Sequence, residues 1–522
     1  MVNLFPEVVP EGGKQPAFLQ RVPGLTLRVT VGSGPIRGLW EHANNMYVVS
    51  GDTFYRVTSG YVITALGTVV GSNPVTMADN GTQIFIAADP SGYIYNTSTG
   101  VFGQITDPNF RGAAVVDYLD GYFVFIEPNS QRVWVTALLD GTSIDPLDFA
   151  SAEGDPDNIV SMIVDHREVW LFGNNTTEVW YNAGLSDFPL ARIQGAFNEL
   201  GCAARYSVAK MNNQVYWLGK DFRGQGIVYV ANGYQGQRVS THAVEWQIQQ
   251  YGSMSDAIGY TYQQDGHSFY VLVFPSAGKT WVYDAATGAW HERAGWDSNW
   301  TQYRGQAQVF FNNENLLGDY ENGQIYAVDQ DTYTYNGETQ RWLRSWRALP
   351  TGENALRRTA QHTLQLDCET GVGLEQYPAY DAEDLTAENG NILLAEYVQN
   401  DLVTESGNVI TTEASGGLEA IADAPPPPYN FTPPVYLTTT EHPAVPGYDP
   451  QAMLRWSDDG GHTWSNEHWR SMGKIGQYGY RTIWRRLGMT EKIRDRVYEV
   501  SGTDPVKIAI MGAELQISGT NA

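Results

Sequence analysis

One eight-residue stretch, SDDGGHTW from Ser457 to Trp464, contains residue types that could do chemistry. It fits the pattern S-x-D-x-G-x-T-W, known as the Asp box, and its carboxylates invite comparison with glycoside hydrolysis, which needs two acids. The spacing favours a β-hairpin turn instead, because an Asp side chain accepts turn hydrogen bonds and glycine permits a positive φ. We therefore expect Ser457, Asp459 and Thr463 to close the turn, Gly461 to relieve it, and Trp464 to fill the core behind it.

A catalytic alternative depends on Arg21. Asp boxes recur in sialidases, which also need three arginines for the substrate carboxylate, a Tyr–Glu nucleophile pair and an Asp acid/base. The first arginine usually lies in an F/Y-R-I-P motif, and Arg21-Val22-Pro23 in LQRVPG comes close. The other arginines are too scattered to nominate. G-x-S-x-G, H-E-x-x-H, Walker A and dinucleotide fingerprints are absent and the nine histidines are dispersed, so we expect no enzyme, no cofactor and no metal site.

Composition sets the class of protein. The chain of 522 residues has 58 acidic and 32 basic residues, a formal charge of −26, so its field disfavours tight binding to nucleic acid or to anionic membranes. Two distant cysteines, Cys202 and Cys368, predict buried free thiols rather than a zinc site or a disulfide framework. We find no secretory signal and no run of about 18 apolar residues, so we expect no membrane anchor.

The first two thirds of the chain repeat a unit of polar turn, alternating strand, second turn and second strand. Seven such units start about 36 to 54 residues apart, which is the spacing of propeller blades. They begin at Asn44, Asn80, Leu119, Asp165, Met211, Asp265 and Asn312. The chain is therefore predicted to be all-β, with a β-propeller of about seven blades over residues 39–340, preceded by an N-terminal arm of residues 1–38.

Two segments support the propeller through closer similarity. Residues 95–102 and 283–290 both read aromatic, Asn or Asp, two residues, Thr-Gly, one residue, aromatic. This pattern is similar to the turns of kelch-type blades, in which the Asx side chain accepts turn hydrogen bonds, glycine supplies a positive φ and the aromatic residue packs between blades. The residues expected in these structural roles are Tyr95, Gly100, Phe102, Tyr283, Asp284, Gly288 and Trp290.

After the propeller the composition changes. Between Arg358 and Arg455 there are 96 residues without Lys or Arg but with 15 acids, and DAPPPPYNFTPPVY lies within them. Strand-rich sequence flanks this stretch on both sides. We predict one β-sandwich built from residues 341–372 and 445–522 and interrupted by an acidic, proline-containing insertion at 373–444.

The segment RRLGMTEKIRDRV, from Arg485 to Val497, locally reverses the charge. Tryptophans and arginines around it have the composition of subunit interfaces, although alternation in a strand must bury about half of the tryptophans. Three interpretations stay open: a subunit contact, a solvated strand edge, or DNA contact, which the lack of interleaved aromatics disfavours. The candidate contact residues are Arg481, Arg485, Arg486, Arg494 and Arg496.

Long strings of the chain resemble the packaged-DNA stabilisation proteins, or tail hub proteins, of short-tailed bacteriophages. They include LQRVPGLTLR, GTSIDPLDFASAEGDPDNIVSMIVDHREVWLFGNNTTEVWYNAG and RSMGKIGQYGYRTIWRRLGMTEKIRDRVYEV. The resemblance implies a virion tail protein made in the cytoplasm of a host bacterium. It further implies a homo-oligomeric ring, generally of six copies, below the portal and its head-to-tail adaptor.

Further expectations follow from that resemblance. Such a ring prolongs the DNA channel, holds packaged double-stranded DNA without sequence-specific binding, and seats a needle, fibre or tailspike. Two alternatives remain: a sialidase-like glycan-processing propeller, which would hydrolyse a sialoside or polysaccharide, and a glycan- or receptor-binding propeller, which would bind without turnover.

Overall fold

The computed structural model describes residues 1–9, 15–152, 154–185, 188–222, 224–347, 358–374, 446–490 and 496–519. These residues form mostly antiparallel β-sheets. They also include the helix α1 (His242–Gln249), between β24 and β25, and the 3-10 turn η1 (Pro275–Ala277), between β26 and β27. The all-β prediction is confirmed. The predicted insertion lies outside the described residues except for residues 373 and 374.

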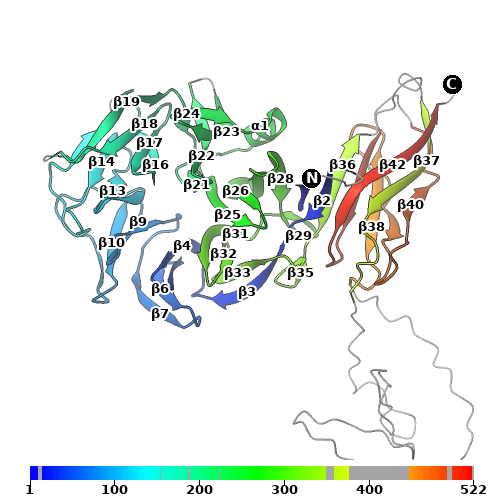
Figure 1. Ribbon diagram of the computed structural model, residues 1–522, viewed down its shortest axis with the longest axis horizontal. Helices are drawn as coiled ribbons and strands as arrows, with labels where there is room; N and C mark the ends of the chain where they lie inside the picture. Colours follow the sequence, from blue (N-terminus) through cyan, green and yellow to red (C-terminus); the bar gives the residue numbers. More distant parts are fainter. Residues whose placement is uncertain are drawn as a thin grey trace, which may run out of the picture. The chain divides into compact units, whose positions relative to one another are not determined.

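Seven sheets form the blades of a propeller and are arranged in a ring in Figure 1. Blade 1 contains β4 (Ile36–His42), β5 (Asn45–Ser50), β6 (Thr53–Thr58) and β7 (Ile63–Thr68); blade 2 contains β8 (Thr76–Asp79), β9 (Gln83–Ala88), β10 (Ser91–Asn96) and β11 (Phe102–Gln104). Blade 3 contains β12 (Val116–Leu119), β13 (Tyr122–Ile126), β14 (Arg132–Val135) and β15 (Phe149–Ser151); blade 4 contains β16 (Ile159–Asp165), β17 (Glu168–Gly173), β18 (Thr177–Asn182) and β19 (Leu190–Asn198).

The remaining blades follow the same strand order, with additions. Blade 5 contains β20 (Gly201–Cys202), β21 (Ala209–Met211), β22 (Gln214–Asp221), β23 (Gly224–Asn232) and β24 (Gln235–Arg238); blade 6 contains β25 (Ile258–Gln264), β26 (His267–Phe274), β27 (Lys279–Asp284) and β28 (Ala289–Arg293). Blade 7 contains β31 (Gly305–Phe311), β32 (Glu314–Asp319), β33 (Gln324–Asp329) and β3 (Gly24–Thr30), extended by β34 (Thr334–Tyr335) and β35 (Glu338–Thr339). A small hairpin, β29 (Gly295–Asp297) and β30 (Asn299–Thr301), connects blades 6 and 7.

The predicted repeat is confirmed, because one of the seven units begins at the first hairpin turn of each blade. These turns have positive φ at Asn44, Asp120, Asn213, Asp265 and Asn312, among others, which is the conformation that tight hairpins require. Asn, Asp and Gly tolerate it best, which is why the sequence signal is regular. The number of blades, uncertain by one from the sequence, is seven.

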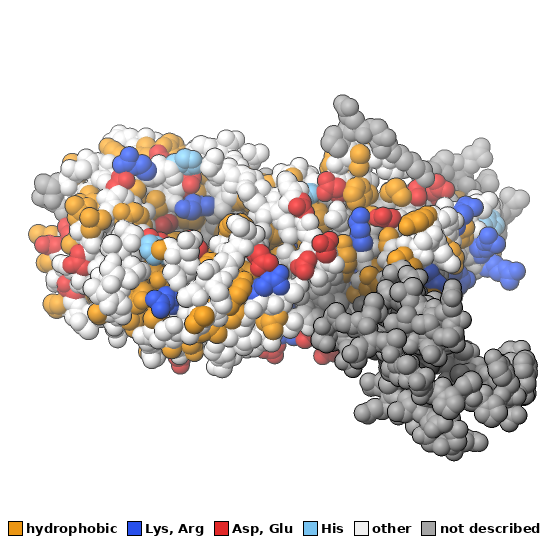
Figure 2. All heavy atoms as spheres, turned by 60° about the horizontal axis from the view of Figure 1, so that its bottom comes forward, with side chains coloured by type: hydrophobic (Ala, Val, Ile, Leu, Met, Phe, Trp, Pro, Cys, Tyr) orange, Lys and Arg blue, Asp and Glu red, His pale blue; other side chains and the backbone are white. Residues whose placement is uncertain are grey.

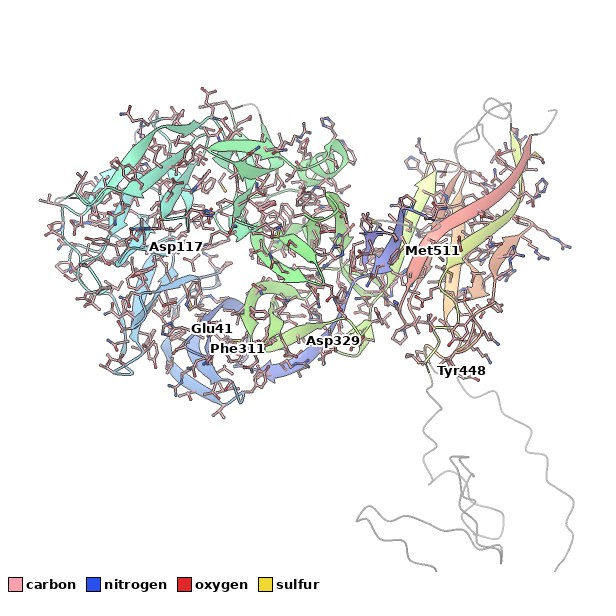
Figure 3. The ribbon with its side chains drawn as sticks, viewed as in Figure 1. Glu41, Asp117, Phe311, Asp329, Tyr448 and Met511 are labelled. Carbon is pink, nitrogen blue, oxygen red and sulfur yellow. The ribbon has the colours of Figure 1, made fainter. Side chains whose placement is uncertain are left out.

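The N-terminal residues do not form a separate arm. Strand β3 pairs with β33, so the propeller ring closes by joining residues that are about 300 positions apart. Closure places the first and last blades side by side, and Figure 3 shows Glu41 of β4 near Phe311 of β31. The preceding hairpin, β1 (Leu4–Val8) and β2 (Ala17–Arg21), joins the sandwich instead.

The second region is a β-sandwich of two sheets. One has the order β1-β2-β42-β37-β40, with β42 (Ala509–Gly519), β37 (Thr359–Cys368) and β40 (Thr482–Arg485); the other has the order β36-β41-β38-β39, with β36 (Trp342–Arg347), β41 (Val497–Gly502), β38 (Gln451–Ser457) and β39 (His468–Ser471). Their facing side chains form one core, which includes Trp342, Leu364, Leu454, Trp484 and Tyr498. Cys368 lies in this core and Cys202 in the propeller, so the expected buried free thiols are confirmed.

Candidate functional site

The Asp box forms a closed turn after β38. Asp459 accepts hydrogen bonds from the N–H groups of His462 and Thr463 at 2.9 Å and from the Thr463 hydroxyl at 2.6 Å. The Ser457 hydroxyl donates to Asp459 at 2.6 Å and accepts from the N–H of Gly461, whose φ is 105°. Hydrogen bonds from Ser457 and Thr463 hold the pKa of Asp459 well below its ordinary value. The carboxylate is therefore occupied by its own turn.

The prediction that Trp464 fills the core is wrong. Trp464 is half-buried, and the guanidinium of Arg455 stacks over it at 4.6 Å from the ring centroid. The core between the sheets is filled by Trp484 and Tyr498, which are on strands, whereas Trp464 follows a turn beyond the end of β38. Its packing stabilises the outer side of the turn.

The turn at residues 95–102 joins the third and fourth strands of blade 2. The side chain of Asn96, next to Tyr95, accepts hydrogen bonds from two backbone N–H groups of the turn at 3.0 and 2.9 Å, and Gly100 has a φ of 74°. The ring of Phe102 lies 5.4 Å from that of Phe54 in blade 1. This is the arrangement expected of a turn that ends in an inter-blade aromatic contact.

The turn at residues 283–290 has the same place in blade 6. Asp284 accepts hydrogen bonds from the N–H of Ala286 at 3.0 Å and from the Thr287 hydroxyl at 2.7 Å, and Gly288 has a φ of 66°. Trp290 lies 5.3 Å from Tyr283 between ring centroids and packs in the core that blades 5 and 6 share. The two similar sequences thus occupy equivalent positions.

Arg21 holds the end of the N-terminal hairpin in place. Its side chain is 1% exposed. It donates from Nε to the side chain of Gln340 at 2.6 Å, and its other nitrogens donate to the backbone carbonyls of Gln340, Tyr333, Asp504 and Val506. The acceptors belong both to the end of blade 7 with the residue that follows it and to the sandwich loop before β42. A guanidinium enclosed in this way links two regions and cannot face a substrate. The sialidase-like alternative therefore has no support from Arg21, the one arginine proposed for it.

A second link joins the hairpin to blade 6. His267 lies between two carboxylates, with Nε2 at 2.5 Å from Glu7 and Nδ1 at 2.8 Å from Asp284. Burial alone lowers the pKa of His267, but the hydrogen bonds to Glu7 and Asp284 outweigh it, so the pKa is raised. Neighbouring His291 and Arg293 are buried, and burial together with the Arg293 charge keeps the pKa of His291 well below its ordinary value.

The predicted contact arginines separate into different environments. Arg481, Arg485 and Arg486 are exposed at β40, which is the edge strand of its sheet. Trp469 of the adjacent edge strand β39 is 45% exposed, and Tyr478 in the connecting loop is 78% exposed. We call these five residues the basic edge; Figure 2 shows Lys and Arg side chains gathered at one end of the sandwich.

Arg496 is not a surface residue. It is 2% exposed, forms a bidentate ion pair with Asp458 at 2.7 Å, and donates to the carbonyls of Leu487 and Met489. It lies directly before β41, and Asp458 of the Asp box neutralises its charge in the interior. Its predicted role in a subunit contact is therefore wrong, whereas Arg494 lies outside the described residues.

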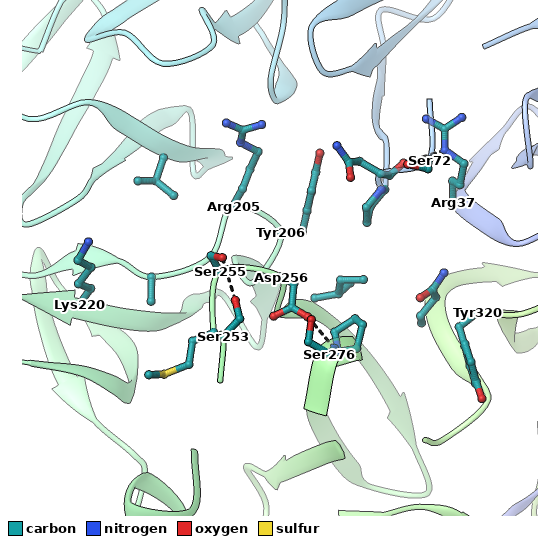
Figure 4. Close-up of a pocket in the computed structure, with 18 of the residues that line it drawn as sticks. Arg37, Ser72, Arg205, Tyr206, Lys220, Ser253, Ser255, Asp256, Ser276 and Tyr320 are labelled. Atoms are coloured by element: carbon teal, nitrogen blue, oxygen red, sulfur yellow. Dashed lines mark hydrogen bonds between the residues drawn. The ribbon is translucent and has the colours of Figure 1, made fainter. Parts of the chain in front are cut away.

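A cavity lies on the propeller axis, and no sequence motif indicated it. It has a volume of about 950 Å³ and is lined by segments from around the ring, where the inner strands begin. Figure 4 shows Arg37, Arg205, Tyr206, Lys220 and Asp256 around it. Apart from the neighbours Arg205 and Tyr206, these residues come from separate strand ends and connections and share no spacing or motif, so no sequence signal could have grouped them.

Neither a metal-binding cluster nor a membrane-spanning helix occurs in the part of the chain described above. Its His, Cys, Asp and Glu side chains form no group of three or more that could bind a metal ion. Nor does this part contain a helix with the length and hydropathy needed to cross a membrane.

Comparison with known proteins gives family and fold similarities. A family model described as Bacteriophage P22 Gp10, beta-propeller, matches residues 1–333, and one described as Bacteriophage P22 Gp10, beta-sandwich, matches residues 437–518. No curated protein matches the chain.

Several solved structures are loosely similar to this chain. The computationally designed Ika8 protein is 15% identical, with 59% of this chain and 99% of that chain covered and a TM-score of 0.37. The N-terminal domain of Nup159 is 11% identical, covering 62% and 98%, with a TM-score of 0.36. Streptogramin B lyase is 8% identical, covering 58% and 95%, with a TM-score of 0.39. Similarity at this level carries no functional argument.

The family matches agree with the two regions of the structure. The first spans more than half of the chain and includes every blade except the added strands β34 and β35, and the second spans most of the C-terminal part of the sandwich. The resemblance predicted from the sequence is confirmed. The chain belongs to the bacteriophage P22 Gp10 family of tail hub and DNA stabilisation proteins of short-tailed phages, and it is a structural protein of the phage tail.

Proposed function

We propose that this chain is the subunit of a tail hub, in which several copies, generally six, form a ring below the portal and its head-to-tail adaptor. The ring prolongs the DNA channel, retains packaged DNA and seats a needle, fibre or tailspike for DNA ejection. The observation that supports this most is the presence of both family regions, propeller and sandwich, in one chain. The hub acts by assembly and not by catalysis.

The charge of the chain suits a DNA channel. A formal charge of −26 repels phosphates, so DNA passes without the salt-sensitive affinity that each phosphate contact would add. Retention then depends on closure of the ring rather than on binding of DNA. Synthesis in the host cytoplasm followed by assembly on the portal belongs to the same proposal.

The basic edge is the proposed contact between neighbouring copies. Edge strands present unpaired backbone groups that can pair with another chain, and exposed Trp, Tyr and Arg are the residues enriched in interfaces. Arg485 and Arg486 are exposed cations in a chain with a large excess of acids, so the surface of a second copy offers complementary charge. Trp484 lies on β40 next to Arg485, but its side chain packs in the sandwich core. This packing holds β40 in place against β37.

The direct test of the hub is a tagged pull-down from infected bacteria followed by negative-stain electron microscopy. We expect rings, or short tails that carry portal and adaptor chains. Recovery of a lone chain without tail partners, together with hydrolysis of glycans or saturable glycan binding, would contradict the proposal in favour of an enzyme or a receptor-binding propeller.

The contact is tested by the double reversal Arg485→Glu and Arg486→Glu. We expect a folded monomer with an unchanged circular dichroism spectrum that no longer assembles in sedimentation velocity. The matched control reverses Arg132 and Arg167, which are exposed on the propeller and change the charge equally. Infectious tails built from the Arg485/Arg486 variant would exclude the basic edge as the contact.

A further inference from the structure

A second cavity, of about 680 Å³, lies beside the first hairpin turns of blades 5, 6 and 7 and shares no lining residue with the axis cavity. Five of the side chains that line it are carboxamides, those of Asn212, Asn213, Gln263, Gln308 and Asn315. We call it the amide cavity. A carboxamide carries no charge and presents N–H donors beside a carbonyl acceptor, so the chemistry of the cavity depends on which of these atoms are left for a ligand.

Hydrogen bonds between blades fix the orientation of four of these carboxamides. The Oδ1 atom of Asn212 in blade 5 accepts from Nε2 of Gln263 at 2.7 Å and from the hydroxyl of Ser268 at 3.1 Å, both in blade 6. In blade 7, Nδ2 of Asn315 donates to the backbone carbonyl of Gln263 at 2.8 Å, and its Oδ1 accepts from Nε2 of Gln308 at 3.3 Å. Nδ2 of Asn212 and the Oε1 atoms of Gln263 and Gln308 have no hydrogen-bond partner among the described residues.

The atoms left free are thus of both kinds, a donor from Asn212 and acceptors from Gln263 and Gln308. Asn213 adds a carboxamide whose side chain forms no hydrogen bond with the described residues. An anion would face the carbonyl oxygens and a cation the N–H groups, whereas a hydroxyl group both donates and accepts and can bond to either. Because the protein already orients these groups, little binding free energy is lost in ordering them. The set favours an uncharged ligand with several hydroxyl groups.

The two charged side chains that line the amide cavity have opposite signs, and both are engaged by the protein. Nζ of Lys210 donates to the backbone carbonyl of Val164 at 2.9 Å, and the carboxylate of Asp165 lies 2.7 Å from Nδ1 of His166. The cavity therefore offers no excess of positive charge to a phosphate or carboxylate ligand, and the acidic chain around it repels such ligands.

Phe310 gives the amide cavity an apolar wall. It is 58% exposed, whereas its neighbours Val309 and Phe311 are buried, because side chains alternate between the two faces of β31. An exposed aromatic ring is favourably covered by another apolar surface. The C–H groups on one face of a pyranose ring form such a surface, and the hydroxyl groups around the rim of the same ring remain free to meet polar partners.

We propose that the amide cavity binds a neutral saccharide. One sugar ring lies on Phe310, and its hydroxyl groups bond to Asn212, Gln263 and Gln308. The volume is within the range of about 300–1,000 Å³ found for ligand sites. The proposal is for binding without bond cleavage. It goes beyond the hub function, because it concerns the single chain and does not depend on ring assembly.

The test uses the full chain and an array of neutral oligosaccharides that includes maltohexaose and repeating units of bacterial surface polysaccharides. The best binder is then titrated by calorimetry. We expect saturable binding of one oligosaccharide per chain, with an affinity that changes by less than about twofold as salt is added. Phe310→Ala should weaken binding about tenfold or more, because the stacking surface is lost. The matched control is Phe222→Ala, which removes a phenylalanine that is 69% exposed in another part of the propeller and should leave the affinity within about twofold.

Further variants separate the amide cavity from the basic edge. Gln308→Leu, checked for folding by circular dichroism, removes an acceptor at nearly constant size and should weaken binding as Phe310→Ala does. The Arg485→Glu, Arg486→Glu variant should bind the saccharide normally. Rings that bind no member of the array would contradict this proposal and leave the hub intact. Affinity that falls steeply with salt, or equal losses from Phe310→Ala and Phe222→Ala, would also overturn it.

Discussion

The propeller and the sandwich are both β-structures, but they are assembled from the chain in opposite ways. Blades 1 to 6 are each formed by one continuous stretch, with neighbouring strands joined by short turns. Each sheet of the sandwich combines strands from distant segments, such as β2, β37 and β42. The propeller is therefore a series of local units, whereas the sandwich depends on long-range pairing, which pays a larger loop-closure entropy before contacts form.

Their cores differ accordingly. Propeller residues pack in several separate clusters between adjacent blades, whereas the sandwich has one cluster between its sheets. The N-terminal residues join these two kinds of structure, because β3 closes the propeller and the hairpin just before it belongs to the sandwich. Changes in this segment should therefore show whether the two regions unfold together.

The largest effect is expected from Arg21→Ala. It removes a buried guanidinium and leaves the carbonyl of Val506 without its donor, so the free energy of unfolding should fall by about 3–5 kcal/mol. We also expect one urea transition to separate into two. The control is Arg28→Ala on β3, whose half-exposed ion pair with Glu314 should contribute about 0–1 kcal/mol.

The two cysteines report on the regions separately in the same variant. Burial raises the pKa of the thiols of Cys202 and Cys368 to about 11 each, so neither should react with a thiol reagent at pH 8 while its region stays folded. In Arg21→Ala we expect faster labelling of Cys368 in the sandwich than of Cys202 in the propeller. Equal acceleration of both would mean that the regions are a single cooperative unit.

A smaller effect is expected from Leu25→Ala, which weakens propeller closure. Leu25 is fully buried on β3, so its truncation should cost about 2–5 kcal/mol through lost apolar contact and a residual cavity. Leu19→Ala, the same change in the half-buried hairpin strand, should cost less. Urea denaturation of both variants measures the difference in the free energy of unfolding. A larger loss of stability from Leu19→Ala would contradict the expectation that propeller closure contributes more than the hairpin.

A modest effect is expected at the turns. Asp459→Ala should lower the stability of the sandwich more than Asp459→Asn, because Asn keeps one acceptor oxygen. The pKa of Asp459 is lowered on folding, so its contribution is present above about pH 3.8 and is lost as the pH falls through the folded value. Thermal melts between pH 2 and 6 measure this. Similar acid sensitivity in Asp459→Ala and the unchanged protein would assign the effect to other groups.

The smallest effect is expected at His267. Its pKa is raised on folding above the ordinary value of 6.5, so the stability it provides is present below pH 6.5 and is lost as the pH rises through the folded value. Melts between pH 5 and 9 should show this decline, and His267→Gln should remove it. The control His166→Gln changes an exposed histidine and should leave the slope intact.

Sequence predicted the propeller well, because its signals are local. Each hairpin turn needs residues that tolerate positive φ, so Asn44, Asp120 and Asn312 mark three of the seven blades without reference to the rest of the chain. The turns at Asn96 and Asp284 were recognisable for the same reason. The presence of a sandwich was also predictable from alternating strands, but the N-terminal hairpin that completes it was not.

What only the tertiary structure decided is which charged residues face solvent and which are enclosed. Arg21, Arg485 and Arg496 are equivalent as residue types, yet one links two regions, one is exposed at a sheet edge, and one neutralises Asp458 inside the sandwich. The axis cavity likewise exists only once the ring has closed. Turns are determined by a few neighbouring residues, whereas burial and charge pairing depend on partners hundreds of positions away, which the sequence alone does not bring together.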